Sequence, residues 1–83
     1  MVQYVFPAVF YVEEDNVTAV IPDLNIFTDG SSIEEAYLYL KDYLRVYCTY
    51  ANKYDMEIDI PSTIEEIQKK YAPAQVMLVD AVV

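Results

Sequence analysis

The residues of this 83-residue chain that could do chemistry are almost all carboxylates, because it holds 14 Asp and Glu, one cysteine and no histidine. The lack of histidine excludes acid–base catalysis and metal ligation by imidazole. A two-metal nuclease needs carboxylates that converge from strand ends and a helix onto the metals. The strand-like stretch 2–12 has none, which leaves only Asp80, Glu34 and Glu35. We therefore predict no catalytic residue, no metal and no cofactor.

The other reactive groups have structural interpretations. Cys48 has no histidine beside it to activate it and lies within an apolar helical pattern, so we expect a buried thiol. Gly30 is the only glycine, which rules out a glycine-rich phosphate loop. Its place after Asp29 makes it a candidate for a turn with positive φ.

The formal charge of −9, from 14 acidic and 5 basic residues, bears on possible partners. Contacts with phosphates need clustered Lys and Arg, so direct binding of nucleic acid is disfavoured. A basic protein would complement the charge, although acidity can also serve solubility alone. Both interpretations stay open for the acidic clusters Glu13–Asp15, Asp55–Glu57–Asp59 and Glu65–Glu66, none of which has the glycine of a calcium loop.

Length and composition indicate one domain spanning 1–83. The hydrophobic content of 55% disfavours disorder, and so much apolar surface in a small chain leaves two interpretations open: all of it is buried within the domain, or some of it is buried against another chain. No apolar run approaches membrane-spanning length and no signal peptide is visible, so we expect a cytoplasmic protein without membrane contact.

The first part of the chain predicts an antiparallel meander of strands at 2–12, 17–21 and 25–28. The polar tetrad 13–16 reads as a hairpin turn in which Asn16 can take a left-handed conformation. Pro7 cannot donate to a ladder, so the first strand needs a bulge or pairing on one side only at that point.

A long helix is predicted from Ser32 to about Tyr54, opened by a capping box between Ser32 and Glu35. Helical spacing defines a stripe that faces the core, made of Ile33, Ala36, Tyr37, Leu40, Leu44, Tyr47, Cys48 and Ala51. A second set flanks this stripe on one edge: Tyr39, Tyr43, Val46, Tyr50 and Tyr54.

Two interpretations of the flanking set stay open. The tyrosines can pack under the following loop, or they can form an interaction surface, because tyrosine is favoured at interfaces. With Asp55, Glu57 and Asp59 they make the candidate surface for a partner or for self-association.

The last third predicts a short strand or an extended connection over 55–60, a short helix from a second capping box to Tyr71, and a strand over 75–83. Either Ser62 with Glu65 or Thr63 with Glu66 can form that box. We expect an α+β fold, β-β-β-α-(short α)-β, with strand order 3-2-1-4. The last strand should lie parallel to the first, which makes the sheet mixed, and the long helix should pack on one face.

The stretch from Ile21 to Ala36 resembles the N-terminal domain of the HicB-like antitoxin family. The resemblance rests on Pro22, Asp23 and Leu24, then Gly30, then Glu34, Glu35 and Ala36, with a first strand similar to Tyr4–Ala8. Asn25 and Ile26 stand where the family usually has Pro-Gly.

The resemblance implies a partial RNase-H-like fold and a role as antitoxin of a HicA–HicB toxin–antitoxin pair. The partner would be a small basic HicA-like toxin that cleaves mRNA, neutralised by stoichiometric occlusion. The resemblance also implies homo-oligomers. The C-terminal DNA-binding segment of many members has no counterpart before Val83, so autoregulation is not carried over.

An alternative without a toxin is a self-associating scaffold or regulatory domain. The apolar last strand and the tyrosine edge could pair two copies in a two-fold dimer.

Overall fold

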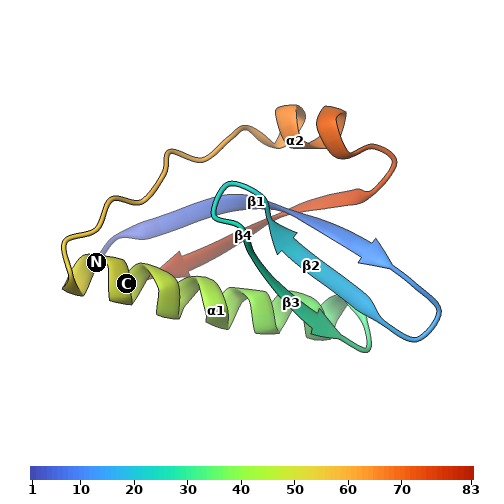
Figure 1. Cartoon of the computed structure of the whole chain (residues 1–83), viewed down its shortest axis with the longest axis horizontal. Coiled ribbons are helices and arrows are strands. Elements are labelled where there is room, and N and C mark those ends of the chain that lie inside the picture. The colour runs from blue at the N-terminus through green and yellow to red at the C-terminus, as the bar shows by residue number, and fades with distance from the viewer.

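The computed structural model describes all 83 residues as four strands and two helices (Figure 1). The elements are β1 (Gln3–Val12), β2 (Val17–Ile21), β3 (Ile26–Gly30), α1 (Ile33–Lys53), α2 (Ile64–Tyr71) and β4 (Gln75–Val82). The predicted order of elements is confirmed. The segment 55–60 is extended but pairs with no strand.

The sheet has the predicted order β3-β2-β1-β4, but all three neighbouring pairs are antiparallel. The expected parallel pairing of the last strand with the first, and with it the mixed sheet, is therefore wrong. Gln75 lies opposite Phe10 and Val82 lies opposite Gln3, so β4 runs against β1 along most of its length.

The reason is that the chain crosses the length of the sheet twice between β3 and β4. The 21 residues of α1 carry it back by about 31 Å. Residues 56–63 can then span roughly 26 Å, and together with α2 they return the chain to the end where α1 began (Figure 1). A helix alone would have given a parallel crossover, and the second crossing reverses the direction of β4.

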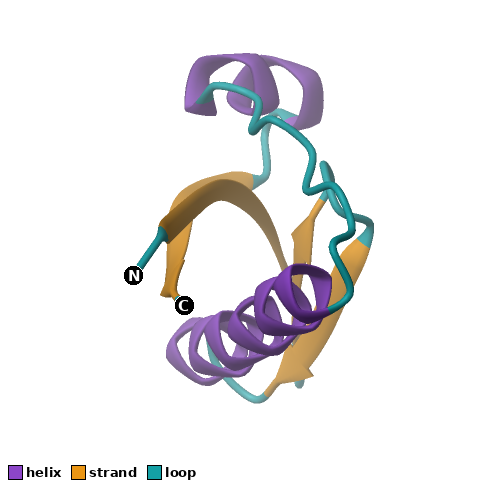
Figure 2. Cartoon of the chain, turned by 90° about the vertical axis from the view of Figure 1, so that its left-hand side faces the viewer, coloured by secondary structure: helices purple, strands orange, loops and turns teal.

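The two helices lie on opposite faces of the curved sheet, α1 on its concave side and α2 on the other (Figure 2). The predicted stripe of α1 forms the core with the inner faces of the strands, and five of its members are buried: Ala36, Leu40, Leu44, Cys48 and Ala51. Ile33, Tyr37 and Tyr47 are half-buried against the same core. Ile67 is the buried residue of α2.

Pro7 is accommodated by pairing on one side, one of the two predicted solutions. Val2 and Val83 exchange two backbone hydrogen bonds of 2.8 and 2.9 Å, which sets the alternation of the β1–β4 ladder. By that alternation Pro7, opposite Leu78, has its nitrogen turned away from β4. On the other side β2 pairs only with residues 9–12 of β1. The missing N–H of Pro7 therefore costs no ladder hydrogen bond.

Both helices begin at caps, with one difference from prediction. The Ser32 hydroxyl accepts from the Glu35 amide at 3.1 Å, but the Glu35 carboxylate accepts from the amide and hydroxyl of Ser31. The reciprocal arm of the box therefore ends one residue earlier than predicted. At α2 the complete box is formed by Thr63 and Glu66, the second of the two predicted pairs.

The positive φ angles lie at Asn25 (56°) and Asp55 (54°), so the prediction of such an angle at Gly30, and of a left-handed Asn16, is wrong. Gly30 is needed for another reason. A Cβ at this position would lie 2.6 Å from the Ala36 nitrogen, because β3 passes directly against the first turn of α1.

We expect Gly30→Ala to destabilise the fold by about 1–3 kcal/mol, since the added carbon meets backbone that cannot turn aside. Urea unfolding measures the change. Asn25→Gly is the control, because a left-handed residue accepts glycine at little cost. Equal stability of Gly30→Ala and the parent chain would contradict the close approach.

Candidate functional site

The predicted flanking set of α1 lies on the surface. The exposed fractions of its side chains are 51% for Tyr39, 45% for Tyr43, 55% for Val46, 58% for Tyr50 and 54% for Tyr54. The following loop therefore leaves about half of each side chain in contact with solvent. Five large side chains on one helix edge make an unusually apolar surface for a chain with this charge.

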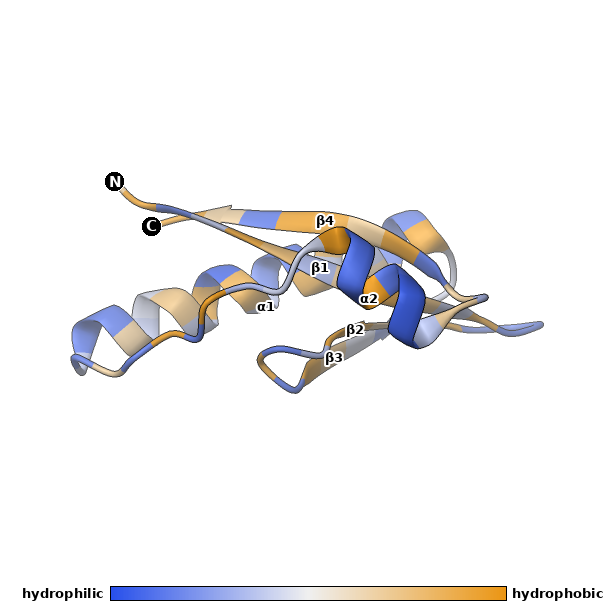
Figure 3. Cartoon of the chain, turned by 90° about the horizontal axis from the view of Figure 1, so that it is seen from above, coloured by the Kyte–Doolittle hydropathy of each residue, from blue (hydrophilic) through white to orange (hydrophobic).

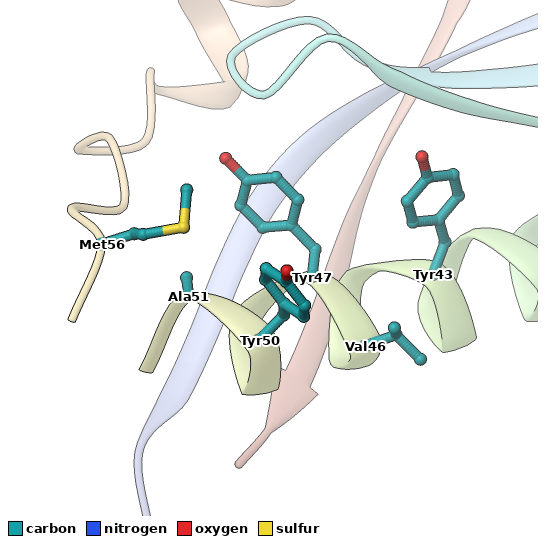
Figure 4. Close-up of a pocket in the computed structure, with 6 residues that line it drawn as sticks. All are labelled: Tyr43, Val46, Tyr47, Tyr50, Ala51 and Met56. Carbon is teal, nitrogen blue, oxygen red and sulfur yellow. The ribbon is translucent and has the colours of Figure 1, made fainter. Parts of the chain in front are cut away.

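Three members of this set border a hollow of about 170 Å³ at the C-terminal half of α1 (Figure 4). Its lining is Tyr43, Val46, Tyr47, Tyr50, Ala51 and Met56, all apolar or aromatic. The hydroxyls of Tyr43 and Tyr47 point in the same direction, away from the helix axis, while Met56 reaches over from the chain beyond the helix (Figure 4). The hollow has the size and character to take one apolar side chain of a partner.

The end of α1 places Met56 at the hollow. Asp55 takes its left-handed angle directly after the helix, and the Met56 amide then donates to the Ala51 carbonyl at 2.8 Å. This backbone bond folds the chain back over the last turn. Aspartate tolerates the left-handed region better than most residues, so its place after the helix was a readable signal for the turn.

Two predicted members do not line the hollow. Tyr54 packs on Tyr50, with ring centroids 4.5 Å apart. Tyr39 lies more than one helical turn before Tyr43 in a separate depression near Ser32 and Glu34. Tyr47, Ala51 and Met56 were missed, because the first two belong to the core-facing stripe and the third to the connection. A side chain at the border of the stripe can serve both the core and the surface.

Two acidic members of the candidate surface, Asp55 and Glu57, flank Met56 of the hollow in sequence, and Asp59 follows three residues after it. Asp55, Glu57 and Asp59 are exposed, and they alternate with Met56 and with Ile58, which is half-buried against the core. The ion pairs of the chain are Lys41–Asp80 and Arg45–Asp42, so these three carboxylates have no cationic partner. The apolar hollow thus has unpaired carboxylates along the chain on one side, while Arg45 and Lys53 lie next to its residues Val46 and Tyr50 on the other.

The residues on which the family resemblance rests have structural roles. The Asp23 carboxylate accepts from the Ser62 amide at 2.8 Å and from the Ser62 hydroxyl at 2.7 Å, which ties the β2–β3 turn to the start of α2. Leu24 and Ala36 are buried, Pro22 is half-buried, and Glu34 lies exposed in the first turn of α1. No local pattern predicts the Asp23–Ser62 contact, because it joins residues 39 positions apart.

The remaining reactive groups do not come together. Burial raises the pKa of the Cys48 thiol, which disfavours the nucleophilic thiolate. No three Asp, Glu or Cys side chains are grouped so that they could hold a metal ion. Asp80 is held instead by Lys41 at 2.8 Å and by the Gln3 amide at 3.1 Å.

Comparison of the chain with protein-family models, with curated proteins and with solved structures found no match. Neither α1 nor α2 combines the length and apolar character needed to cross a membrane.

We expect the double substitution Val46→Asn with Tyr50→Asn to leave the fold intact, because both side chains are about half exposed. Thermal unfolding followed by circular dichroism should show a midpoint within a few degrees of the parent chain. Leu44→Ala on the buried face is the comparison and should cost about 2–5 kcal/mol. Equal losses in the two variants would show that Val46 and Tyr50 belong to the core.

The Lys41–Asp80 contact predicts a pH dependence. The hydrogen bond from Lys41 lowers the pKa of Asp80, so this carboxylate stabilises the fold above its unfolded pKa and loses that effect as the pH falls through the lower folded value. Lys41→Met should move the Asp80 pKa back up, as measured by NMR titration of the carboxyl carbon. The pKa of Asp29, lowered by hydrogen bonds from Thr18 and Asn16, should stay unchanged as an internal control.

Proposed function

We propose that this chain is an antitoxin-like protein-binding module that neutralises a small basic mRNA-cleaving toxin by stoichiometric occlusion. The observation that carries the proposal is the apolar hollow on α1 beside the unpaired carboxylates of Asp55, Glu57 and Asp59. The resemblance to HicB-like antitoxins supplies the class of partner. The place of action would be the cytoplasm, where mRNA is translated.

The two parts of this surface would contribute differently to binding. An apolar side chain of the partner inserted between Tyr43, Tyr50 and Met56 would be shielded from water, and buried aromatic contacts of this kind dominate interface energies. The carboxylates would steer a cationic protein towards the hollow and select against acidic ones. The chain needs no catalytic group for this role.

Occlusion would follow from negative charge, which the phosphates of RNA and the carboxylates of Asp55–Asp59 have in common. A ribonuclease holds RNA phosphates with Lys and Arg side chains. The segment Asp55–Asp59 offers three carboxylates within five residues and would compete for those cations. A bound antitoxin would therefore cover the surface that otherwise meets the substrate.

The partial RNase-H-like fold belongs to the same proposal. The strand order and the long helix on one face agree with it, while the antiparallel direction of β4 departs from it. Binding through the hollow and the carboxylates does not require this fold.

The test is co-expression with the product of the adjacent reading frame, followed by isothermal titration calorimetry of the purified pair. We expect a complex of fixed stoichiometry, an affinity that falls as salt rises, and rescue of growth and of mRNA integrity. Asp55→Asn, Glu57→Gln and Asp59→Asn together should weaken binding about tenfold or more.

The matched control neutralises three acids elsewhere, with Glu13→Gln, Glu14→Gln and Asp15→Asn at the β1–β2 turn. It removes the same charge and should change the affinity by less than about threefold. Equal losses in the two triple variants would assign the effect to net charge and reject the hollow as the site. A basic neighbour that does not bind at micromolar concentration would reject the toxin pairing.

A further inference from the structure

The outer edge of β4 is a free strand edge whose backbone orientation can be worked out. The two hydrogen bonds between Val2 and Val83 and the continuous register with β1 place Tyr4, Phe6 and Ala8 in hydrogen-bonded pairs with the odd-numbered residues of β4. The even-numbered residues of β4 therefore direct their N–H and C=O groups away from β1. They are Val76, Leu78, Asp80 and Val82.

One of these outward groups is already occupied. Lys41 on α1 reaches around the edge, and its Nζ donates to the Asp80 carbonyl at 3.0 Å and to the Asp80 carboxylate at 2.8 Å. A charged side chain laid on an edge strand is a common way to limit pairing with other chains. Here it leaves the first half of β4, around Val76 and Leu78, open.

This open half is apolar and carries no charge. Leu78 is 49% exposed, and Val76 and Met77 are half-buried. Leu38, 53% exposed, lies three residues before Lys41 and therefore on the side of α1 that reaches this edge. Figure 3 shows β4 at the margin of the sheet with apolar colour over most of its length.

We propose that β4 pairs with β4 of a second copy of this chain, antiparallel and with the two-fold axis at Met77. Val76 then lies opposite the partner's Leu78, and Leu78 opposite the partner's Val76. Each of these two pairs exchanges two backbone hydrogen bonds, so the four strands of each copy join in one continuous sheet.

The position of the axis follows from the edge itself. An axis at Leu78 would pair Val76 with the partner's Asp80 and would need the Asp80 carbonyl that Lys41 occupies. An axis at Asp80 would place two carboxylates opposite each other, which is unfavourable. The axis at Met77 keeps the Lys41–Asp80 contact in both copies, pairs Val76 with Leu78 across the axis and places Gln75 opposite the partner's Val79.

The charges near the outer edge of β4 favour a second copy of this chain over a basic protein as the pairing strand. The charged side chains at the β4 edge, Lys41 and Asp80, neutralise each other, so this edge has no attraction for a basic protein. On a chain of charge −9, an edge whose own two charges cancel adds no repulsion between two copies. The edge of β3 is a poorer choice, since it has five residues, includes Asp29 and ends at Gly30 against the Ala36 backbone.

The experiment is light scattering and sedimentation of the full chain over a range of concentration and salt. We expect a dimer whose fraction rises with salt, because salt screens the repulsion between two acidic copies. Binding of a basic partner at the hollow should instead weaken as salt rises. The opposite salt dependence distinguishes the β4 dimer from the complex with a basic partner, so each proposal can be rejected without the other. A monomeric mass at about 1 mM in high salt would overturn the proposal.

Leu78→Pro tests the edge directly, because it removes an outward N–H without touching the ladder to β1. Pro7, directly opposite, already occupies the equivalent position. We expect at least tenfold weaker dimerisation, with Leu78→Lys as a second variant that keeps the backbone donor. Phe27→Thr on β3, whose parent side chain is 60% exposed, is the matched control and should leave the dimer unchanged.

Hydrogen exchange of the unmodified chain gives an independent reading. The amides of Val76 and Leu78 should become protected as concentration rises, while the Val82 amide, beyond the paired segment, should not. Exchange of Val76 and Leu78 that is independent of concentration, or dissociation by Phe27→Thr alone, would assign any dimer to another surface and reject the β4 pairing.

Discussion

The arrangement of this molecule depends on the return of the chain across the sheet between its two helices. The extended segment after α1 is fastened at one end by the Met56–Ala51 backbone bond and at the other by Asp23, whose carboxylate holds Ser62. Ile58 packs between these points. Because the segment restores the chain to the far end of the sheet, β4 must enter antiparallel to β1. The same segment carries the acidic side chains past the hollow on α1.

The chain separates its charge from its apolar surface. The acidic residues lie mostly in turns, in the first turns of the helices and in the returning segment, while the lining of the hollow on α1 and the first half of β4 are uncharged. Interfaces commonly combine an apolar centre with a polar rim. The hollow on α1 has both parts, and the β4 edge has only the first. This difference is the physical basis for assigning a basic protein to one surface and a second copy to the other.

Features that depend on a single helix or strand could be predicted from the sequence. The helical stripe through Leu40 and Leu44, the Thr63–Glu66 box and the one-sided pairing at Pro7 follow from spacing and from missing donors. The direction of β4 was not readable, because a connection of ten residues can end a crossover or reverse it. Gly30 was interpreted as a turn residue, whereas its requirement comes from a backbone approach between β3 and α1 that no local pattern encodes.

The place of β1 at the centre of the sheet has a consequence for biosynthesis. β1 leaves the ribosome first, yet its neighbour β4 is made last, and the core residues Val79 and Ala81 arrive with it. Until then, β1 keeps one edge unpaired while residues 13–74 are made. Contacts between residues so far apart in sequence form slowly, and exposed strand edges favour association of nascent chains. Pro7 interrupts the donor row only on the other edge of β1, so the edge that awaits β4 has no such interruption.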